Sequence, residues 1–189
     1  MSTSEHNSRN PPNSTEFVIE HNSCNPLNSP EFVIRQWLQA VKDPEIPTIS
    51  LIDLGVVRRV EIDEVSGEVY VQLTPTFAGC PAMDYMKRDV ERTLLGHGVA
   101  AVRVEISMQE AWSSDMLTEA GRAALRAHRL SPPPVLAGQV LDLDFLEYAE
   151  CPNCQQHNTE LRTPFGATLC RAVHYCFDCK QIFEQFKPL

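Results

Sequence analysis

The chain of 189 residues lacks several features that mark membrane, exported and nucleic-acid-binding proteins. No apolar run approaches the roughly 18–20 residues needed to cross a bilayer. The N-terminal sequence MSTSEHNSRNPPNS contains no apolar segment of the signal-peptide kind. Lys and Arg form no run and the formal net charge is −9, so the surface repels a phosphate backbone. We therefore expect no membrane partner, no nucleic-acid partner and a cytoplasmic location.

Cysteine, by contrast, is well represented, with seven residues in a chain that is 43% hydrophobic. That apolar content is enough to bury a core, so global disorder is excluded. In a chain without an export signal, cysteines serve as metal ligands or reactive thiols more often than as a disulfide framework. The cysteines are therefore the first candidates for function.

The N-terminal region contains a short duplication. Residues 5–19 (EHNSRNPPNSTEFVI) and 20–34 (EHNSCNPLNSPEFVI) match at twelve of fifteen positions. Two polar copies are too few and too hydrophilic to build a solenoid core. Only the second copy runs into a helical pattern, so we predict that residues 1–28 are a disordered, duplicated leader, in which Cys24 has no role.

Residues 29–130 are predicted to form an α+β domain. Ser29 as N-cap and Pro30 as first helical residue begin a helix. We expect this helix to end at Asp43-Pro44, because a residue before proline avoids the α region.

The rest of this predicted domain alternates strands and helices. Residues 57–73 have the pattern of a β-hairpin around a Ser66-Gly67 turn. A second helix follows, then a third strand and a short helix. The second helix carries one apolar stripe, formed by Met83, Met86, Val90 and Leu94. The order helix, two strands, helix, strand, helix predicts a small α/β sandwich of the α+β class.

Residues 131–144 are predicted to be a proline-rich linker, and residues 145–189 a separate small module. A module of about 40 residues is too small to fold by hydrophobic burial alone, so bound metal would supply folding free energy. Two C-x₂-C pairs separated by 21 residues can aim four thiolates at one ion and close a tetrahedral site. The predicted metal ligands are Cys151, Cys154, Cys176 and Cys179.

The identity of the metal and the roles of the neighbouring residues are less determined. Four thiolates suit zinc and also an iron–sulfur cluster, and the paired turns, with Phe165 and Phe183 after them, favour structural zinc. Cys170 lies between the pairs and is either a small buried residue or an additional, exchangeable ligand. We expect His157 and His174 to face solvent, since four thiolates already fill a site.

Cys80 stands apart from the other cysteines, in the segment TFAGCPAMD between Gly79 and Pro81. The pattern places it where a strand passes into a helix. At a helix N-terminus, unpaired backbone N–H groups and the macrodipole favour a thiolate, which is both a nucleophile and a soft metal ligand. A small buried residue that caps the helix is an equally good interpretation.

Three segments resemble an iron–sulfur assembly family that includes SufT: DPEIPTISLIDLGVV, VQLTPTFAGCPAMD and AWSSDMLTEAGRAALRAHRLSPP. Together with the C-terminal CPNC…FGATLCRAVHYCFDCKQIFEQFK, the chain resembles the PaaD-like group, which is associated with the phenylacetyl-CoA epoxidase of aerobic phenylacetate breakdown. The resemblance covers about residues 30–189. It implies an α+β assembly domain followed by a zinc ribbon.

The resemblance implies help with iron–sulfur clusters rather than the oxygenation itself. The family's characteristic cysteine falls on Cys80, and its acidic positions fall on Asp43, Glu45 and Asp53, which would contact the cluster or the client. By themselves these carboxylates are ordinary loop residues. The implied cofactors are structural Zn²⁺ and a transient iron–sulfur cluster. The implied partners are the epoxidase subunits, especially the iron–sulfur reductase subunit, and the iron–sulfur assembly machinery.

Three functions compete on these observations. The leading hypothesis is an accessory or maturation factor of the epoxidase system, without catalytic activity of its own. The second is a stoichiometric structural subunit of the oxygenase complex. The third is a thiol enzyme with Cys80 as nucleophile, which has weak support because no histidine lies near Cys80 in a base-like context; His97 closes the same helix at its far end.

Overall fold

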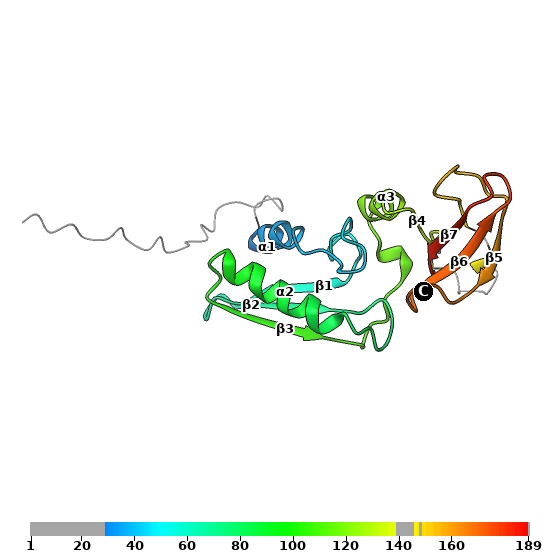
Figure 1. Ribbon diagram of the computed structural model, residues 1–189. Coiled ribbons are helices and arrows are strands. Elements are labelled where there is room, and N and C mark those ends of the chain that lie inside the picture. Colours follow the sequence, from blue (N-terminus) through cyan, green and yellow to red (C-terminus); the bar gives the residue numbers. More distant parts are fainter. Residues whose placement is uncertain (1–28, 139–145, 148, 189) are drawn as a thin grey trace, which may run out of the picture.

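The computed structural model describes residues 29–138, 146–147 and 149–188 (Figure 1). The predicted leader at residues 1–28, Cys24 within it, and residues 139–144 of the predicted linker lie outside the described residues. Among the residues that are described, no helix has the length and apolar character needed to cross a bilayer.

The secondary structure confirms the α+β class and the predicted order of elements. From the N-terminus the elements are α1 (Pro30–Leu38), β1 (Val57–Ile62), β2 (Glu68–Leu73), α2 (Met83–Gly96), β3 (Ala101–Ile106), the 3₁₀ helix η2 (Ser114–Met116), α3 (Glu119–Ala127), β4 (Leu130–Ser131), β5 (Thr159–Thr163), β6 (Arg171–Cys176) and β7 (Ile182–Phe186). We refer to the elements from α1 to α3 as the α+β domain and to the sheet of β4 to β7 as the ribbon.

The sheet of the α+β domain has the strand order β1-β2-β3. β1 and β2 form the predicted antiparallel hairpin, whereas β2 and β3 run parallel. A parallel pair needs a crossover connection, and α2 provides it along one face of the sheet (Figure 1). The buried side chains of α2 are those of the predicted stripe: Met83, Met86, Val90 and Leu94.

The first helix begins as predicted but ends earlier. The Ser29 side chain accepts a hydrogen bond from the Phe32 N–H, and Pro30 is the first helical residue. The helix ends at Leu38, so the predicted end at Asp43 is wrong. The reason is a tertiary contact: the Val41 carbonyl accepts from the Leu51 N–H at 3.0 Å, in a short antiparallel bridge. This bridge takes backbone groups that a longer helix would need and buries Val41 in the core.

The ribbon sheet has the order β4-β7-β6-β5, and its first strand follows α3 directly. Leu130 and Ser131 pair parallel with Glu184 and Gln185 of β7. The first residue of the predicted linker is therefore part of a sheet. The proline segment that follows contacts α3, because the Arg122 side chain donates a hydrogen bond to the Pro133 carbonyl.

The ribbon packs directly against the α+β domain. Phe186 of β7 and Leu130 of β4 belong to the same cluster of buried residues as the domain core. The Phe186 ring lies edge-on to Trp112, with 5.7 Å between ring centroids. Arg171 of β6 donates to the Glu45 carbonyl at 3.3 Å. These contacts bring the start of β6 next to the DPEIP turn, where the candidate thiol site lies.

Candidate metal and thiol sites

Four cysteine sulfurs gather at one end of the ribbon. Within the described part of the chain, Cys151, Cys154, Cys176 and Cys179 form the group of potential metal ligands, and their Sγ atoms all lie within 4.8 Å of one another. The Cys151–Cys179 and Cys154–Cys176 sulfurs are 3.6 and 3.5 Å apart. Four sulfurs at about 2.3 Å from a tetrahedral zinc ion are roughly 3.8 Å apart, so this cluster fits the ion closely.

Both C-x₂-C pairs use the same turn. The residue after the second cysteine of each pair has a left-handed backbone, with φ of 62° at Gln155 and 60° at Lys180. In each turn the first cysteine donates its N–H at 2.9 Å, from Cys151 to the Gln156 carbonyl and from Cys176 to the Gln181 carbonyl. The turns therefore hold the sulfurs together by backbone geometry, next to a small buried cluster that includes Ala149 and Phe183.

The turn after β6 also favours one thiolate. Backbone N–H groups, chiefly that of Cys179, lower the pKa of Cys176 to about 7. Burial is the main reason that the pKa of Cys179 is raised to about 12. Metal binding would displace the proton of Cys179, because only thiolates ligate. The donor set thus has the chemistry and spacing of a closed zinc site.

The two histidines near this cluster differ from each other. His157 is exposed, as predicted. His174 is fully buried, so the prediction that it faces solvent is wrong. β6 lies between β5 and β7, and His174 points to the inner face, with its Nε2 3.1 Å from the Gln185 side-chain oxygen. Burial lowers the pKa of His174, which keeps it neutral at physiological pH.

Cys80 lies three residues before the first residue of α2 and is partly buried. Burial raises its pKa, and the charges of Asp43 and Glu45 raise it further, whereas the backbone N–H groups of Ala82 and Met83 lower it. The net shift is upward. Of the two interpretations that the sequence left open, the upward shift of the pKa favours the partly buried thiol over the thiolate, because desolvation and two nearby carboxylates outweigh the backbone N–H groups.

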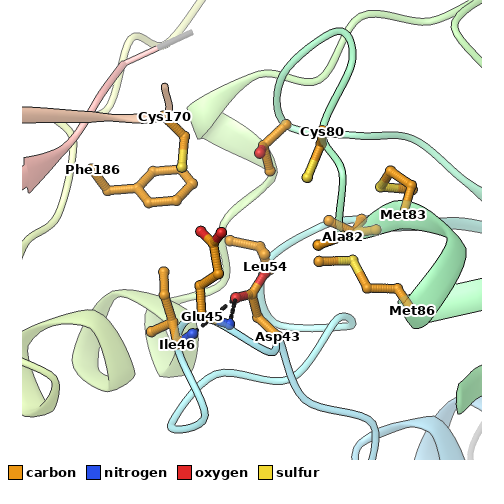
Figure 2. A pocket seen from close by; sticks show the side chains of 12 residues that line it. Asp43, Glu45, Ile46, Leu54, Cys80, Ala82, Met83, Met86, Cys170 and Phe186 are labelled. Carbon is orange, nitrogen blue, oxygen red and sulfur yellow. Dashed lines mark hydrogen bonds between the residues drawn. The ribbon is translucent and has the colours of Figure 1, made fainter. Parts of the chain in front are cut away.

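Asp43 and Glu45 occupy one turn but play different parts in it. Asp43 is buried, and its Oδ1 accepts from the Glu45 and Ile46 N–H groups at 2.8 and 2.9 Å (Figure 2). Burial nevertheless raises the pKa of Asp43. Glu45 is exposed, and its carboxylate extends from the turn toward Cys170 and Cys80 in Figure 2. Asp43 thus shapes the turn that presents Glu45.

Asp53 lies elsewhere and has a structural role. Its two carboxylate oxygens accept from Ser50 Oγ at 2.6 Å and from Thr118 Oγ1 at 2.8 Å. Thr118 is the N-cap of α3, so Asp53 ties the start of that helix to the loop before β1. A side chain at Gly121 would collide with the Asp53 carbonyl, which explains the glycine. Asp53 is not among the residues that line the cleft beside Cys80.

A cleft with a volume of about 310 Å³ lies where the α+β domain meets the ribbon. Cys80 lines it from one side and Cys170 from the other, with Glu45 beside them. Cys170 lies outside the four-cysteine group, packs against the domain core and has Thr168 Oγ1 3.0 Å from its sulfur. Sequence spacing could not place Cys80 and Cys170 on one cleft, although both, like Cys24, lie outside the two C-x₂-C pairs.

Comparisons with known proteins match both parts of the chain. Residues 32–106 match the family described as iron-sulfur cluster assembly protein, and residues 144–187 match the PaaD zinc beta ribbon domain. A protein of Escherichia coli (strain K12), named as a subunit of the 1,2-phenylacetyl-CoA epoxidase, is 34% identical over 151 residues, which are 79% of this chain and 88% of that protein.

A second relative is shorter. The Fe-S protein maturation auxiliary factor of Porphyromonas gingivalis is 34% identical over 87 residues, which are 46% of this chain and 81% of that protein. Among solved structures, a domain of unknown function from Bacillus anthracis is 28% identical, with 50% of this chain and 90% of that one covered and a TM-score of 0.47.

Proposed function

The chain belongs to the PaaD family, in which an iron–sulfur assembly domain precedes a zinc ribbon, and we propose that it is a maturation factor of a phenylacetyl-CoA epoxidase system. Its client would be the iron–sulfur reductase subunit of that epoxidase, and its cargo an iron–sulfur cluster or the iron for one. Two relatives support this role, one named as an epoxidase subunit and one as an Fe-S protein maturation factor.

The observation that carries the proposal is the position of Cys80. Its thiol lines a cleft that opens to solvent and has Glu45 beside it. Thiolates are soft ligands that iron accepts, and a nearby carboxylate attracts cations. A partly exposed thiol with one carboxylate beside it suits transient contact with iron better than permanent storage.

The same cleft argues against a thiol enzyme. Among the described residues that line it, none is a histidine that could take a proton from Cys80. His97, at the far end of α2, stacks on Trp37 with 4.5 Å between ring centroids. The raised pKa of Cys80 also leaves little thiolate at neutral pH. We therefore assign no catalytic residue.

The four-cysteine site would hold zinc in a structural role. Four protein thiolates leave no position for water or substrate. Its contribution to function would be indirect, because the ribbon that it stabilises supplies Cys170 and Phe186 to the walls around Cys80.

The test is co-expression of the chain with the epoxidase reductase subunit. We expect Cys80→Ser to leave the chain folded while the reductase accumulates without its cluster, measured as iron and acid-labile sulfide per reductase. Cys24→Ser is the matched control and should support normal loading. Normal cluster content and epoxidase activity with Cys80→Ser would eliminate the proposal.

One observation supports a second function, that of a structural subunit. The Escherichia coli relative is named as a subunit, which fits a stoichiometric structural component of the oxygenase complex. Co-purification with the other epoxidase subunits at a fixed ratio, unaffected by Cys80→Ser, would favour that function. A chain that dissociates once the reductase is loaded would favour maturation.

A further inference from the structure

We propose that the cleft between the α+β domain and the ribbon is a docking site for a short extended segment of the client protein, in which a Lys or Arg lies next to an apolar residue. This inference rests on the proposed function, because it states how a client would be held beside Cys80. Three properties of the cleft identify the occupant: an apolar lining, a single negative charge and two firmly held walls.

The lining of the cleft is mostly apolar. Phe77 and Pro81 contribute to it from the α+β domain, and Ala167 and Leu169 from the loop between β5 and β6. Leu169 is 52% exposed, so this surface is open to a partner. The volume of about 310 Å³ is at the lower end of the roughly 300–1,000 Å³ of ligand sites, which suits a few side chains better than a large cofactor. Covering the lining would remove apolar area from water and so favour binding.

The charge in the cleft selects a basic partner. Among the described residues that line it, Glu45 is the one that carries a charge at neutral pH, and it is exposed. The hydrogen bonds of Glu45 in the described part of the chain are made by its backbone, with Asp43 at 2.8 Å and Arg171 at 3.3 Å. The Arg171 guanidinium pairs with Glu184 instead, at 3.0 Å. A Lys or Arg of the partner would therefore find a carboxylate beside an apolar surface.

Both walls of the cleft are held in place before a partner arrives. In the loop between β5 and β6, the Ala167 N–H donates to the Glu184 carboxylate at 2.7 Å. A side chain at Gly166 would lie only 2.7 Å from the same carboxylate, so this loop packs closely against β7. On the opposite wall, the Cys80 N–H closes a turn by donating to the Phe77 carbonyl at 3.2 Å. A formed surface reduces the ordering cost of docking.

Two other occupants fit this charge less well. A second copy of the chain would bring a formal net charge of −9 against the same charge. In the N-terminal region, the apolar residues 17–19 (FVI) lie between Glu16 and Glu20, which Glu45 would repel. A basic segment of another protein has neither disadvantage.

The experiment titrates the full chain, with zinc in the four-cysteine site, with the acetylated heptapeptides GSLRLSG, GSLELSG and GSSRSSG. We expect GSLRLSG to shift the amide NMR signals of Phe77 and Leu169 and to slow the alkylation of Cys80 by iodoacetamide. GSLELSG should bind about fivefold more weakly, because an exposed attractive ion pair becomes a repulsive one. GSSRSSG should bind about tenfold more weakly, because it buries no leucine.

Variants of the chain assign the contacts. Leu169→Ser should weaken the binding of GSLRLSG by about tenfold. Glu45→Lys should reverse the preference, so that GSLELSG binds more tightly than GSLRLSG, which a merely structural role of Glu45 would not produce. The matched controls, Glu64→Lys and Val65→Ser in the exposed turn after β1, should bind like the unmodified chain. The zinc content and unfolding midpoint of each variant show that its fold is intact.

Four results would overturn the inference. Equal affinities of the unmodified chain for GSLRLSG and GSLELSG would reject a basic partner. The absence of NMR shifts with all three peptides at millimolar concentration would reject docking in the cleft. A dimer of the chain that Leu169→Ser dissociates would make a second copy the occupant. Binding that appears only with Phe17→Ser would make residues 17–19 the occupant.

The proposed function is tested separately, with the reductase subunit in place of the peptides. If Leu169→Ser and Glu45→Lys leave reductase binding unchanged while Cys80→Ser still prevents cluster loading, the function stands and the docking site does not. Reductase binding that needs Leu169 and Glu45, together with normal cluster loading by Cys80→Ser, would reject the function alone.

Discussion

The chain contains two groups of cysteines, and they differ in how the fold assembles them. The four ribbon sulfurs come from two identical turns and lie within 4.8 Å of one another. Cys80 and Cys170 come from different parts of the fold and line one cleft only because the ribbon packs on the α+β domain. The first arrangement is suited to keep a metal ion. The second places two thiols on the walls of an open cleft.

The pKa values differ between the two groups at one cysteine only, since burial raises the pKa of Cys179 in the ribbon as it does those of the cleft thiols. Backbone N–H groups lower the pKa of Cys176 to about 7 in the ribbon. In the cleft, burial raises the pKa values of both Cys80 and Cys170. In the ribbon, therefore, Cys176 is the thiol most readily deprotonated, and metal binding would displace the proton of Cys179. The cleft thiols hold their protons until a strong ligand interaction displaces them.

Removing zinc should have the largest effect and would show whether the two groups depend on each other. Structural zinc contributes on the order of 10 kcal/mol to small domains. We expect Cys154→Ser, or chelation of the unmodified chain, to abolish hydrogen-exchange protection in β5 to β7 while α2 keeps its protection. Cys24→Ser is the control. Persistent protection of β6 in protein shown to be free of zinc would contradict the structural role of the site.

The next largest effect should come from Phe186, which joins the two regions. It is 2% exposed and contacts Trp112 edge-on. Phe186→Ala should lower the free energy of unfolding by about 3–5 kcal/mol, measured by urea denaturation, and should speed the alkylation of Cys80 by loosening the cleft. Phe165→Ala is the control, because Phe165 is 67% exposed. Equal effects of the two substitutions would mean that the cores are not coupled through Phe186.

A smaller effect is expected at Asp43, and it depends on pH. Burial raises its pKa in the folded chain above the unfolded value, so the folded state binds the proton more tightly. That stabilisation is complete below the unfolded pKa of about 4 and is lost as pH rises through the folded pKa.

Asp43→Asn can still accept the two backbone hydrogen bonds but does not ionise. Its free energy of unfolding should therefore rise relative to that of the unmodified chain between acidic and neutral pH. Urea denaturation at several pH values measures this difference. A difference that is constant with pH would show that the Asp43 carboxyl has no raised pKa.

The smallest effect should be a shift in the reactivity of Cys80. Its alkylation by iodoacetamide should reach half-maximal rate at a higher pH than that of a cysteine in a short peptide, because burial raises its pKa. Asp43→Asn and Glu45→Gln should each move the midpoint to lower pH by removing a nearby negative charge. Glu64→Gln should leave it unchanged. A midpoint below that of the peptide would instead support the interpretation that the helix N-terminus keeps Cys80 as a thiolate.

Local sequence signals predicted much of this structure. Ser29 and Pro30 mark the start of α1 because capping depends on neighbouring residues alone. The stripe on α2 and the β1–β2 hairpin follow from periodicity in the same way. The grouping of the four ribbon cysteines was also predictable, since two short turns determine most of it.

The features that the sequence did not predict correctly share a different cause. The end of α1 depends on Leu51, whose N–H pairs with the carbonyl of Val41 in a bridge that propensity does not encode. His174 is buried because it lies on the covered face of β6, whereas its neighbours Val173 and Tyr175 are only partly buried, and the sequence does not show which face is covered. The proximity of Cys170 to the Cys80 cleft depends on how the ribbon docks. Each of these depends on contacts between segments that are distant in sequence. Local residue patterns do not predict which distant segments come together.

The two-residue strand β4 determines how the chain can be divided. Leu130 and Ser131 complete the ribbon sheet, although the sequence around the prolines suggests a natural cutting point there. A fragment that ends at residue 130 would expose the surface of Trp112 that Phe186 covers, and a ribbon fragment that begins at the prolines would present β7 with an unpaired edge. The two parts are therefore poor modules for exchange between proteins, and chimeras that retain β4 together with β7 should be the ones that leave no unpaired edge on β7.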